Sequence, residues 1–303
     1  MKENTRGILF AFAAILLWST IASAFKLSLR YMDFIDLMAT ATWVSTVFLF
    51  LVLLFQRKLP VIAGLGWNRY MNGALLGLLN PFLYYLVLLK AYSLLRAQEA
   101  GTLNYIWPIT LVLLSIPLLG KKINIVSISA IFISFFGILV ISTEGNPGTL
   151  QFREPWGAAL AVGSSIFWSL YWILNMKNPL DEVVGLFINF LFGSLYILVL
   201  ILIRGGYTLT LPGLAGGAYI GIFEMGLTFI LWLKALKLAQ NTALVSNLVY
   251  LSPFISLAII RLAVNEEILA STFAGLIFIV AGILIQQQSR RIFRMFRRDG
   301  QSR

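Results

Sequence analysis

The sequence predicts an all-α integral membrane protein with ten transmembrane helices, arranged as two inverted five-helix repeats. Its 303 residues are 59% hydrophobic and only 12% charged, whereas soluble domains carry about 25% charged residues. The apolar residues gather in runs of roughly 20, the length that a helix needs to cross a bilayer. The pattern of the first five runs returns in the last five. Because five is odd, the second half would enter the membrane from the opposite side.

Each predicted span is an apolar run between short polar connections. The ten spans are 7–25, 34–55, 71–92, 97–118, 123–142, 155–175, 183–203, 213–233, 240–262 and 268–287. A polar break rich in Gly, Pro and charge, TEGNPGTLQFRE, separates the halves. The predicted parts are a first five-helix repeat at 1–142, a connecting loop at 143–154, a second repeat at 155–287 and a basic cytoplasmic tail at 288–303.

Matched residues support the repeat. Trp18 corresponds to Trp168, and Asn80 to Glu224. The spaced glycines of the third span, Gly73 and Gly77, return in the eighth as Gly217 and Gly221. Small residues at this spacing let helices approach closely, so we expect them to pack within the fold or at a dimer interface. Repeated membrane helices with polar residues at mid-span in both copies are typical of a transporter.

The basic residues predict the orientation. Placing the N-terminus in the cytoplasm puts most of the 23 Lys and Arg in cytoplasmic loops and in the tail, as the positive-inside rule expects. We therefore predict a multi-pass protein of the inner (plasma) membrane with both termini cytoplasmic. The first span has a partner in the sixth, so we interpret it as a retained span and not as a cleaved signal peptide. The tail, SRRIFRMFRRDGQSR, could contact anionic lipids or serve only as a topology anchor.

The composition excludes several kinds of chemistry. The sequence has no cysteine and no histidine, which removes thiol nucleophiles, imidazole bases and most zinc sites. We therefore expect no catalytic residues, no metal site, no cofactor and no enzyme activity. The net charge of +11 is accounted for by loops and tail, so we expect no nucleic-acid partner.

One carboxylate stands apart from the rest. Glu224 lies near the middle of its span, whereas the other acidic residues lie near span ends, in loops or in tails. A carboxylate at that depth is costly unless it faces a cavity, has a partner or is protonated. Glu224 is therefore predicted to bind a substrate amine or to carry a coupling proton. The alternative is a structural hydrogen bond to a neighbouring helix.

Prolines mark three predicted bends. Pro81 follows Asn80 in the third span, and Pro108 and Pro253 occupy matched places three residues after a tyrosine. A proline frees a backbone carbonyl and bends a membrane helix. We expect Asn80 and Asn247 to offer polar contacts to a substrate, with packing bends as the alternative.

Aromatic residues accompany these bends. Trp18 and Trp168 lie deep in their spans, unlike belt tryptophans. Together with other rings they could form a cage for flat or cationic solutes, or simply a core. The further candidates for this cage are Tyr84, Tyr85, Tyr105, Trp107, Tyr171 and Tyr250. Lys90 and Lys234 are predicted near opposite ends of their spans, as gating residues or as side chains that extend to the interface.

The stretch after the eighth span resembles the signature of the EamA-type drug/metabolite transporters. That stretch reads KALKLAQNTALVSNLVYLSPFISLAIIRLAVNEEI, and the first half carries KAYSLLRAQEAGTLNYIWPITLVLLSIPLLGKKI. The resemblance covers all ten spans and implies a basket of ten helices around a central cavity. It departs from the family at Lys121-Lys122, where an acidic residue is usual. Within the family, NYIWP is most similar to exporters of aromatic amino acids.

The sequence thus predicts a transporter that moves a small metabolite by alternating access. Aromatic or apolar amino acids are the first choice of solute and export the expected direction, with proton coupling as an option and a monomer or homodimer as the assembly. The alternatives are a carrier for nucleotide sugars, sugar phosphates or quaternary ammonium drugs, and a structural or assembly protein.

Overall fold

The fold was analysed in a computed structural model, which describes residues 2–120, 124–148, 153–175, 178–238 and 248–299. In these ranges the chain forms helices and no strand. The helices of the first half are α1 (Lys2–Ser28), α2 (Phe34–Phe55), α3 (Leu59–Ala63), α4 (Trp67–Gly77), η1 (Leu78–Leu83), α5 (Tyr84–Leu94), α6 (Ala97–Asn104), α7 (Trp107–Leu119) and α8 (Ile125–Ser142). Those of the second half are α9 (Pro155–Asn175), α10 (Glu182–Arg204), α11 (Leu211–Tyr219), η2 (Ile220–Leu227), α12 (Thr228–Leu238), η3 (Val249–Leu251), α14 (Ser252–Ala263) and α15 (Ala270–Asp299).

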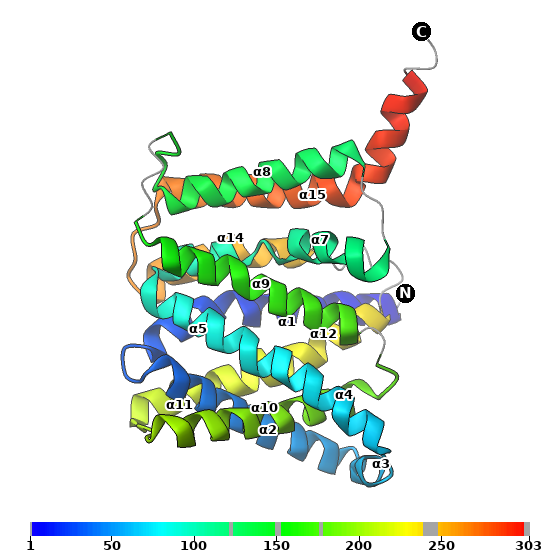
Figure 1. Ribbon diagram of the computed structural model, residues 1–303, viewed down its shortest axis with the longest axis vertical. Helices are drawn as coiled ribbons and strands as arrows, with labels where there is room; N and C mark the ends of the chain where they lie inside the picture. The colour runs from blue at the N-terminus through cyan, green and yellow to red at the C-terminus, as the bar shows by residue number, and fades with distance from the viewer. Residues whose placement is uncertain (1, 121–123, 149–152, 176–177, 239–247, 300–303) are drawn as a thin grey trace.

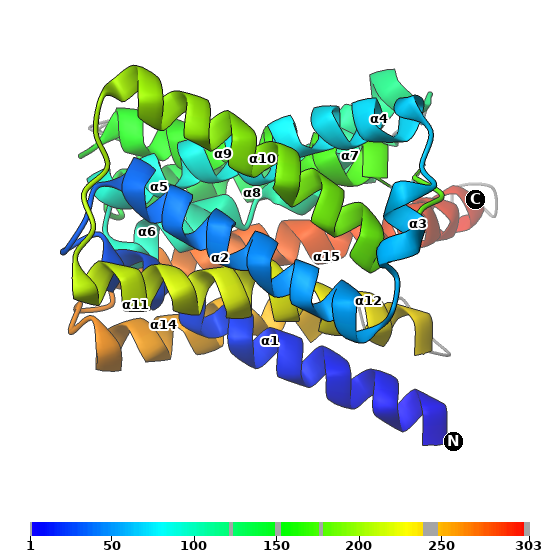
Figure 2. The ribbon, with the colours of Figure 1, turned by 90° about the horizontal axis from the view of Figure 1, so that it is seen from below.

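The helices have the length and composition of a multi-span membrane protein. Among the described residues, nine are long and apolar enough to cross a bilayer, and Val249–Ala263 forms a shorter apolar helix. The predicted ninth span, 240–262, begins in a segment outside the described residues. Its described part contains η3 and α14. α1 begins and α15 ends at the same end of the bundle (Figures 1 and 2), which requires an even number of crossings.

The helices lie in layers (Figure 1). α8 and α15 pack side by side as an outer layer, with α7 and α14 beneath them. α1, α5, α9 and α12 follow, and α2, α10 and α11 lie on the far side with α4. We call the end of the bundle where α1 begins and α15 ends the terminal end, and the opposite end the distal end. The distal end holds the described parts of the connections 29–33, 95–96, 143–154, 205–210 and 264–269.

The packing is the same when the two halves are exchanged. α1 packs on α12 and α14, and its counterpart α9 packs on α5 and α7. α2 and α10 pack on each other, as do α8 and α15. At the crossing of α2 and α10, the hydroxyls of Thr46 and Ser194 are 2.8 Å apart. This arrangement supports the proposal of two equivalent five-helix repeats.

Matched glycines allow the closest approaches in this arrangement. A Cβ atom at Gly77 would lie 2.3 Å from the backbone oxygen of Asn189 in α10, and one at Gly221 would lie 2.4 Å from that of Ala41 in α2. Only glycine fits where two backbones come this near. The small-residue pairs of the third and eighth spans therefore pack within the fold.

The α2–α10 pair is also tied by charge at both ends. At the distal end, Arg204 pairs with Asp33 at 2.8 Å and with buried Asp36. At the terminal end, Lys58 pairs with Asp181 at 2.7 Å. Asp33 and Asp181 are the N-caps of α2 and α10, so each helix start is tied to the end of the partner helix. Partial burial raises the pKa of Asp181, but hydrogen bonding and charge attraction from Lys58, with backbone N–H groups, outweigh it and keep the pKa below its ordinary value.

Replacing Gly77 or Gly221 with alanine is expected to lower the stability of the protein. The added methyl group would overlap a backbone oxygen that cannot move alone, and overpacking of this kind costs about 1–3 kcal/mol. Thermal unfolding in detergent measures the effect. Gly163→Ala is the matched control, because a Cβ there meets nothing within 4 Å. An equal loss in the control would show that the close approach is not the cause.

The Lys58–Asp181 pair predicts a pH dependence. Because the pKa of Asp181 is lowered in the folded state, its stabilisation is present above the unfolded pKa of about 4 and is lost as the pH falls through the folded value. Asp181→Asn keeps an N-cap acceptor and removes the charge, so we expect a loss of about 0.2–1 kcal/mol at pH 7, the range for exposed pairs. Melting temperatures measured from pH 7 to pH 3 should converge at the acidic end. In the double variant, Lys58→Met should cause no further loss of stability beyond that of Asp181→Asn, because the ion pair is already absent.

Candidate functional site

A cavity of about 520 Å³ lies between the two halves, lined by α1, α5, α6, α7, α9, α14 and α15 with η2, α12 and η3. Its walls are mostly aromatic and aliphatic. Its polar lining residues include Gln98, Asn104, Glu224, Ser252 and Gln287. A volume in this range suits one small organic molecule.

Two matched helix breaks shape the cavity. α6 ends at Asn104, and α7 restarts at Trp107 with Pro108 in its first turn. In the second half, the 3₁₀ turn η3 precedes α14, which has Pro253 in its first turn. Both prolines line the cavity. A proline is well tolerated in the first turn of a helix, where its missing N–H has no intrahelical partner. The predicted paired bends are therefore present.

Aromatic rings form the inner wall. The Trp168 ring centroid lies 4.8 Å from that of Tyr84, 6.5 Å from that of Trp107 and 5.7 Å from that of Trp172. On the other side, the rings of Trp18 and Trp232 are 5.3 Å apart. Tilted and edge-on contacts of this kind hold the rings in place.

Glu224 places a carboxylate in this aromatic wall. It belongs to η2, and 6% of its surface is exposed. The Tyr85 hydroxyl donates a hydrogen bond to its Oε1 at 3.1 Å. The Trp18 indole also interacts with the carboxylate, and Oε2 accepts no well-formed hydrogen bond from any described residue. Glu224 therefore keeps one unused acceptor at the edge of the cavity.

Trp168 leaves an unused donor in the same cavity. Its ring is buried, and its Nε1 donates to no acceptor among the residues that the structure describes. Buried polar atoms without partners are rare in folded proteins. Both residues line the cavity, and in this structure both unpaired atoms are themselves covered by neighbouring atoms.

Other polar groups of the cavity bind one another. Asn104 accepts a hydrogen bond from the Tyr84 hydroxyl at 3.3 Å and donates one to Ser164 at 2.8 Å. The Tyr105 hydroxyl reaches the break of the other half, where it donates to the Val249 carbonyl at 3.1 Å. The Tyr250 hydroxyl is bound by the Gln287 side chain. These contacts fix the positions of the helices that bound the cavity.

Most of the residues singled out in the sequence lie at this cavity. Those that line it are Trp18, Tyr84, Tyr105, Trp107, Trp168, Glu224, Tyr250, Pro108 and Pro253. Asn80 is fully buried in η1 and is not among the described lining residues; Pro81 packs on the position of Gly193. Asn247 and Lys121-Lys122 fall outside the described residues.

The two span-end lysines lie away from the cavity lining. The Lys90 ammonium is 5.0 Å from the ring centroid of Phe34, and that of Lys234 is 5.9 Å from the ring centroid of Phe10. Lys90 is half-buried and Lys234 is exposed. Both contacts are of the cation–π kind. Their gating role stays a prediction.

The sequence reasoning missed several lining residues. Trp172 and Trp232 lie near the terminal end of their helices, and Gln98 and Gln287 lie near span ends. Polar residues near a span end resemble ordinary interfacial residues, so only the fold distinguishes them. The signal for Trp172 was its spacing from Trp168, since residues four apart share a helix face.

Comparisons with known proteins agree with this architecture. The model of the EamA-like transporter family matches residues 5–143 and 155–286. An uncharacterized transporter from Clostridium kluyveri is 27% identical over 57% of this chain, and the alignment spans 58% of that protein. The aromatic amino acid exporter YddG from Salmonella typhimurium is 22% identical over 93% of this chain and 97% of that protein.

A solved crystal structure shares the fold. The superposition covers 95% of this chain and 99% of the other chain, with a TM-score of 0.65 and 21% sequence identity. The family match extends over nearly all the helices that surround the cavity. The chain therefore belongs to the EamA-like transporter family and is a multi-pass membrane protein.

Proposed function

We propose that this protein transports small amphiphilic solutes that carry an amine, with aromatic or apolar amino acids as the first class, and that it exports them. The observation that carries the proposal is the unpaired Oε2 of Glu224 beside an aromatic cavity. A carboxylate buried in a membrane protein needs a partner of opposite charge or a proton. An ammonium group supplies that partner, and the rings around it would add cation–π attraction.

The body of the solute would lie against the aromatic wall. Trp18, Trp107 and Trp168 offer flat surfaces for a ring or an aliphatic chain. The Nε1 of Trp168 is a suitable donor for the carboxylate of an amino acid. The exporter YddG, with which this chain aligns over almost its whole length, is named for aromatic amino acids, and this supports the same class here.

Organic cations such as quaternary ammonium compounds are the second candidate class. No lysine or arginine is found among the described residues that line the cavity, so a net positive solute would meet no repulsion there. The same observation argues against nucleotide sugars and sugar phosphates, whose phosphates call for arginine or lysine. Phenylalanine, phenethylamine and N-acetyl-phenylalanine separate these classes, because they present a zwitterion, a cation and an anion on the same ring.

The transport cycle would be alternating access, in which the helices around the cavity rock about the breaks at Pro108 and Pro253. Glu224 would hold the amine, or exchange it for a coupling proton. We further propose a location in the inner (plasma) membrane with both termini cytoplasmic and with the basic tail near anionic lipids. The assembly would be a monomer or a homodimer.

Glu224→Gln is expected to weaken transport in proteoliposomes. Hydrogen bonds to charged groups contribute about 1.5–3 kcal/mol, so the apparent affinity for phenylalanine or phenethylamine should fall roughly 10- to 150-fold. Labelled solute flux with and without a proton gradient measures the effect. Glu154→Gln, which changes a carboxylate outside the cavity lining, is the matched control. Unchanged flux of every tested solute in Glu224→Gln would remove the proposed role.

Trp168→Phe is expected to separate zwitterions from simple cations. The change keeps an aromatic ring and removes the unpaired N–H, and a neutral hydrogen bond contributes about 0.5–1.5 kcal/mol. The apparent affinity for phenylalanine should fall about 2- to 12-fold, while that for phenethylamine changes less. Trp156→Phe serves as control, since Trp156 is 62% exposed and lies outside the cavity lining. An equal loss for both solutes would place the solute carboxylate elsewhere.

A further inference from the structure

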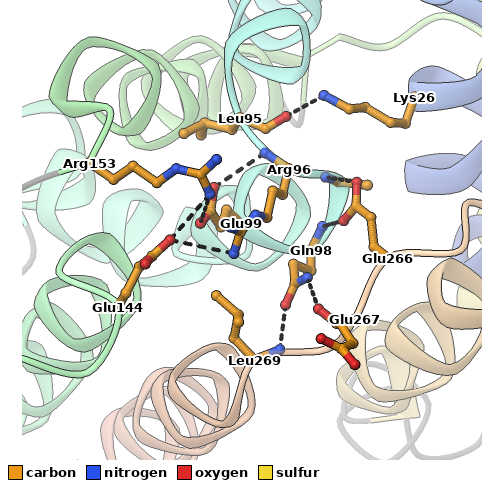
Figure 3. A network of polar contacts seen from close by, with 11 residues as sticks. Lys26, Leu95, Arg96, Gln98, Glu99, Glu144, Arg153, Glu266, Glu267 and Leu269 are labelled. Atoms are coloured by element: carbon orange, nitrogen blue, oxygen red, sulfur yellow. Dashed lines mark hydrogen bonds and ion pairs between the residues drawn. The ribbon is translucent and has the colours of Figure 1, made fainter.

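At the distal end, polar contacts join the two halves of the chain around Gln98 (Figure 3). Gln98, in the first turn of α6, lines the cavity and is fully buried. Its Nε2 donates to the backbone oxygen of Glu267 at 2.7 Å, and its Oε1 accepts from the backbone N–H of Leu269 at 2.9 Å. Both polar atoms of Gln98 are therefore used to hold the segment between α14 and α15.

Glu266 fastens the same segment to the start of α6. Its carboxylate accepts hydrogen bonds from the backbone N–H groups of Ala97 at 3.0 Å and of Gln98 at 3.4 Å. These amides have no partner within their own helix. A carboxylate is favoured at this position, because the start of a helix carries partial positive charge. Side chains therefore bind backbone in both directions. Glu266 binds the amides of Ala97 and Gln98, and Gln98 binds the backbone of Glu267 and Leu269.

Weaker ion pairs surround these bonds. Arg96 and Arg153 both pair with Glu144, at 3.4 and 3.2 Å. The Lys26 ammonium donates to the Leu95 carbonyl and so joins α1 to the same region. Glu144 and both arginines are a third or more exposed, and exposed ion pairs contribute little. The buried bonds of Gln98 and the charged bonds of Glu266 are therefore the stronger part of this closure.

We propose that Glu266 and Gln98 form a latch that holds the distal end of the cavity closed and that must open for a solute to pass there. The latch joins α6 of the first half to the α14–α15 connection of the second, the parts that would separate. Its bonds all lie between residues 97–98 at the start of α6 and residues 266–269 of the connection. The inference rests on the proposed transport function, but closure can be measured without any solute.

The absence of cysteine from the sequence permits a direct test with a single reporter. Ser256→Cys places a thiol on the α14 wall of the cavity. A membrane-impermeant maleimide is added from the face opposite a C-terminal tag, in membranes whose orientation the tag establishes. Glu266→Gln should raise the labelling rate from this distal face about tenfold, the change expected when charged hydrogen bonds are weakened. The rate from the terminal face should not rise.

Glu267→Gln is the matched control, because it makes the same charge change one residue away while the backbone oxygen that binds Gln98 remains. Gln98→Met, which keeps the size of the side chain, is the second latch variant and should also speed distal labelling. Each variant is first checked for an unchanged elution profile and melting temperature, and Gln98→Met decides the test if Glu266→Gln does not fold. Distal labelling no faster in the folded latch variants than in Glu267→Gln would overturn the proposal. That result would leave the proposed solute class unaffected. If flux of the proposed solutes fails while the latch variants label faster, the solute class would be wrong and the latch would stand.

Discussion

Backbone polar groups inside a membrane must find partners within the protein, because lipid tails offer none. The structure depends on this constraint at each place where a helix departs from α geometry. Side chains, most of them from other helices, supply hydrogen bonds near these places. The Tyr196 hydroxyl donates to the Ala74 carbonyl just before η1, and the Thr228 hydroxyl to that of Phe223 within η2. Ser169 binds the Trp107 carbonyl at the start of α7, and Tyr105 binds that of Val249 in η3.

These partners explain how a cavity can exist between the halves. In a continuous helix, each backbone carbonyl accepts a hydrogen bond from an N–H of the next turn. A break leaves some carbonyls without that partner, and hydroxyls from neighbouring helices can bind them instead. Tyr105 links the break of the first half to that of the second, so in this structure one hydrogen bond joins the two bends across the cavity. The same bends bring Pro108 and Pro253 to the lining. Glu224 lies within another irregular segment, η2, in which Gly221 makes the close contact with α2.

Much of the fold and part of the site could be predicted from the sequence. Apolar runs gave the helices, and the repeated glycines and prolines predicted close packing and bends that the structure contains. The repeat was a weaker guide to side chains. Asn80 and Glu224 are matched in sequence, yet Glu224 lines the cavity and Asn80 is buried away from it. Exchange of the halves relates some side chains, such as Trp18 and Trp168, which both line the cavity, but not Asn80 and Glu224. A sequence match alone therefore does not say which residues face the cavity.

The latch residues were harder to predict for a different reason. Gln98 is a polar residue near a span end, where the sequence alone suggests contact with water or headgroups. Its role follows from the α14–α15 connection, which is about 170 residues further along the chain and returns over the start of α6. A contact at that separation leaves no local pattern. The buried face of a helix can be predicted from the pattern of one segment. A contact such as that of Gln98 can be predicted only when the positions of both segments are known.

The charged contacts lie in two separate parts of the molecule, the α2–α10 pair and the latch of Glu266 and Gln98. α2 and α10 are tied at both ends, by Arg204 with Asp33 and by Lys58 with Asp181, and their hydroxyls meet in the middle. Arg204 also binds the buried Asp36, so these contacts together favour two helices that stay in register. The cavity lies on the other side of the bundle, where α6, α7 and α14 are short segments joined by breaks. Under the proposed function, motion would therefore concentrate in these segments, and Glu266 with Gln98 would set how easily they part.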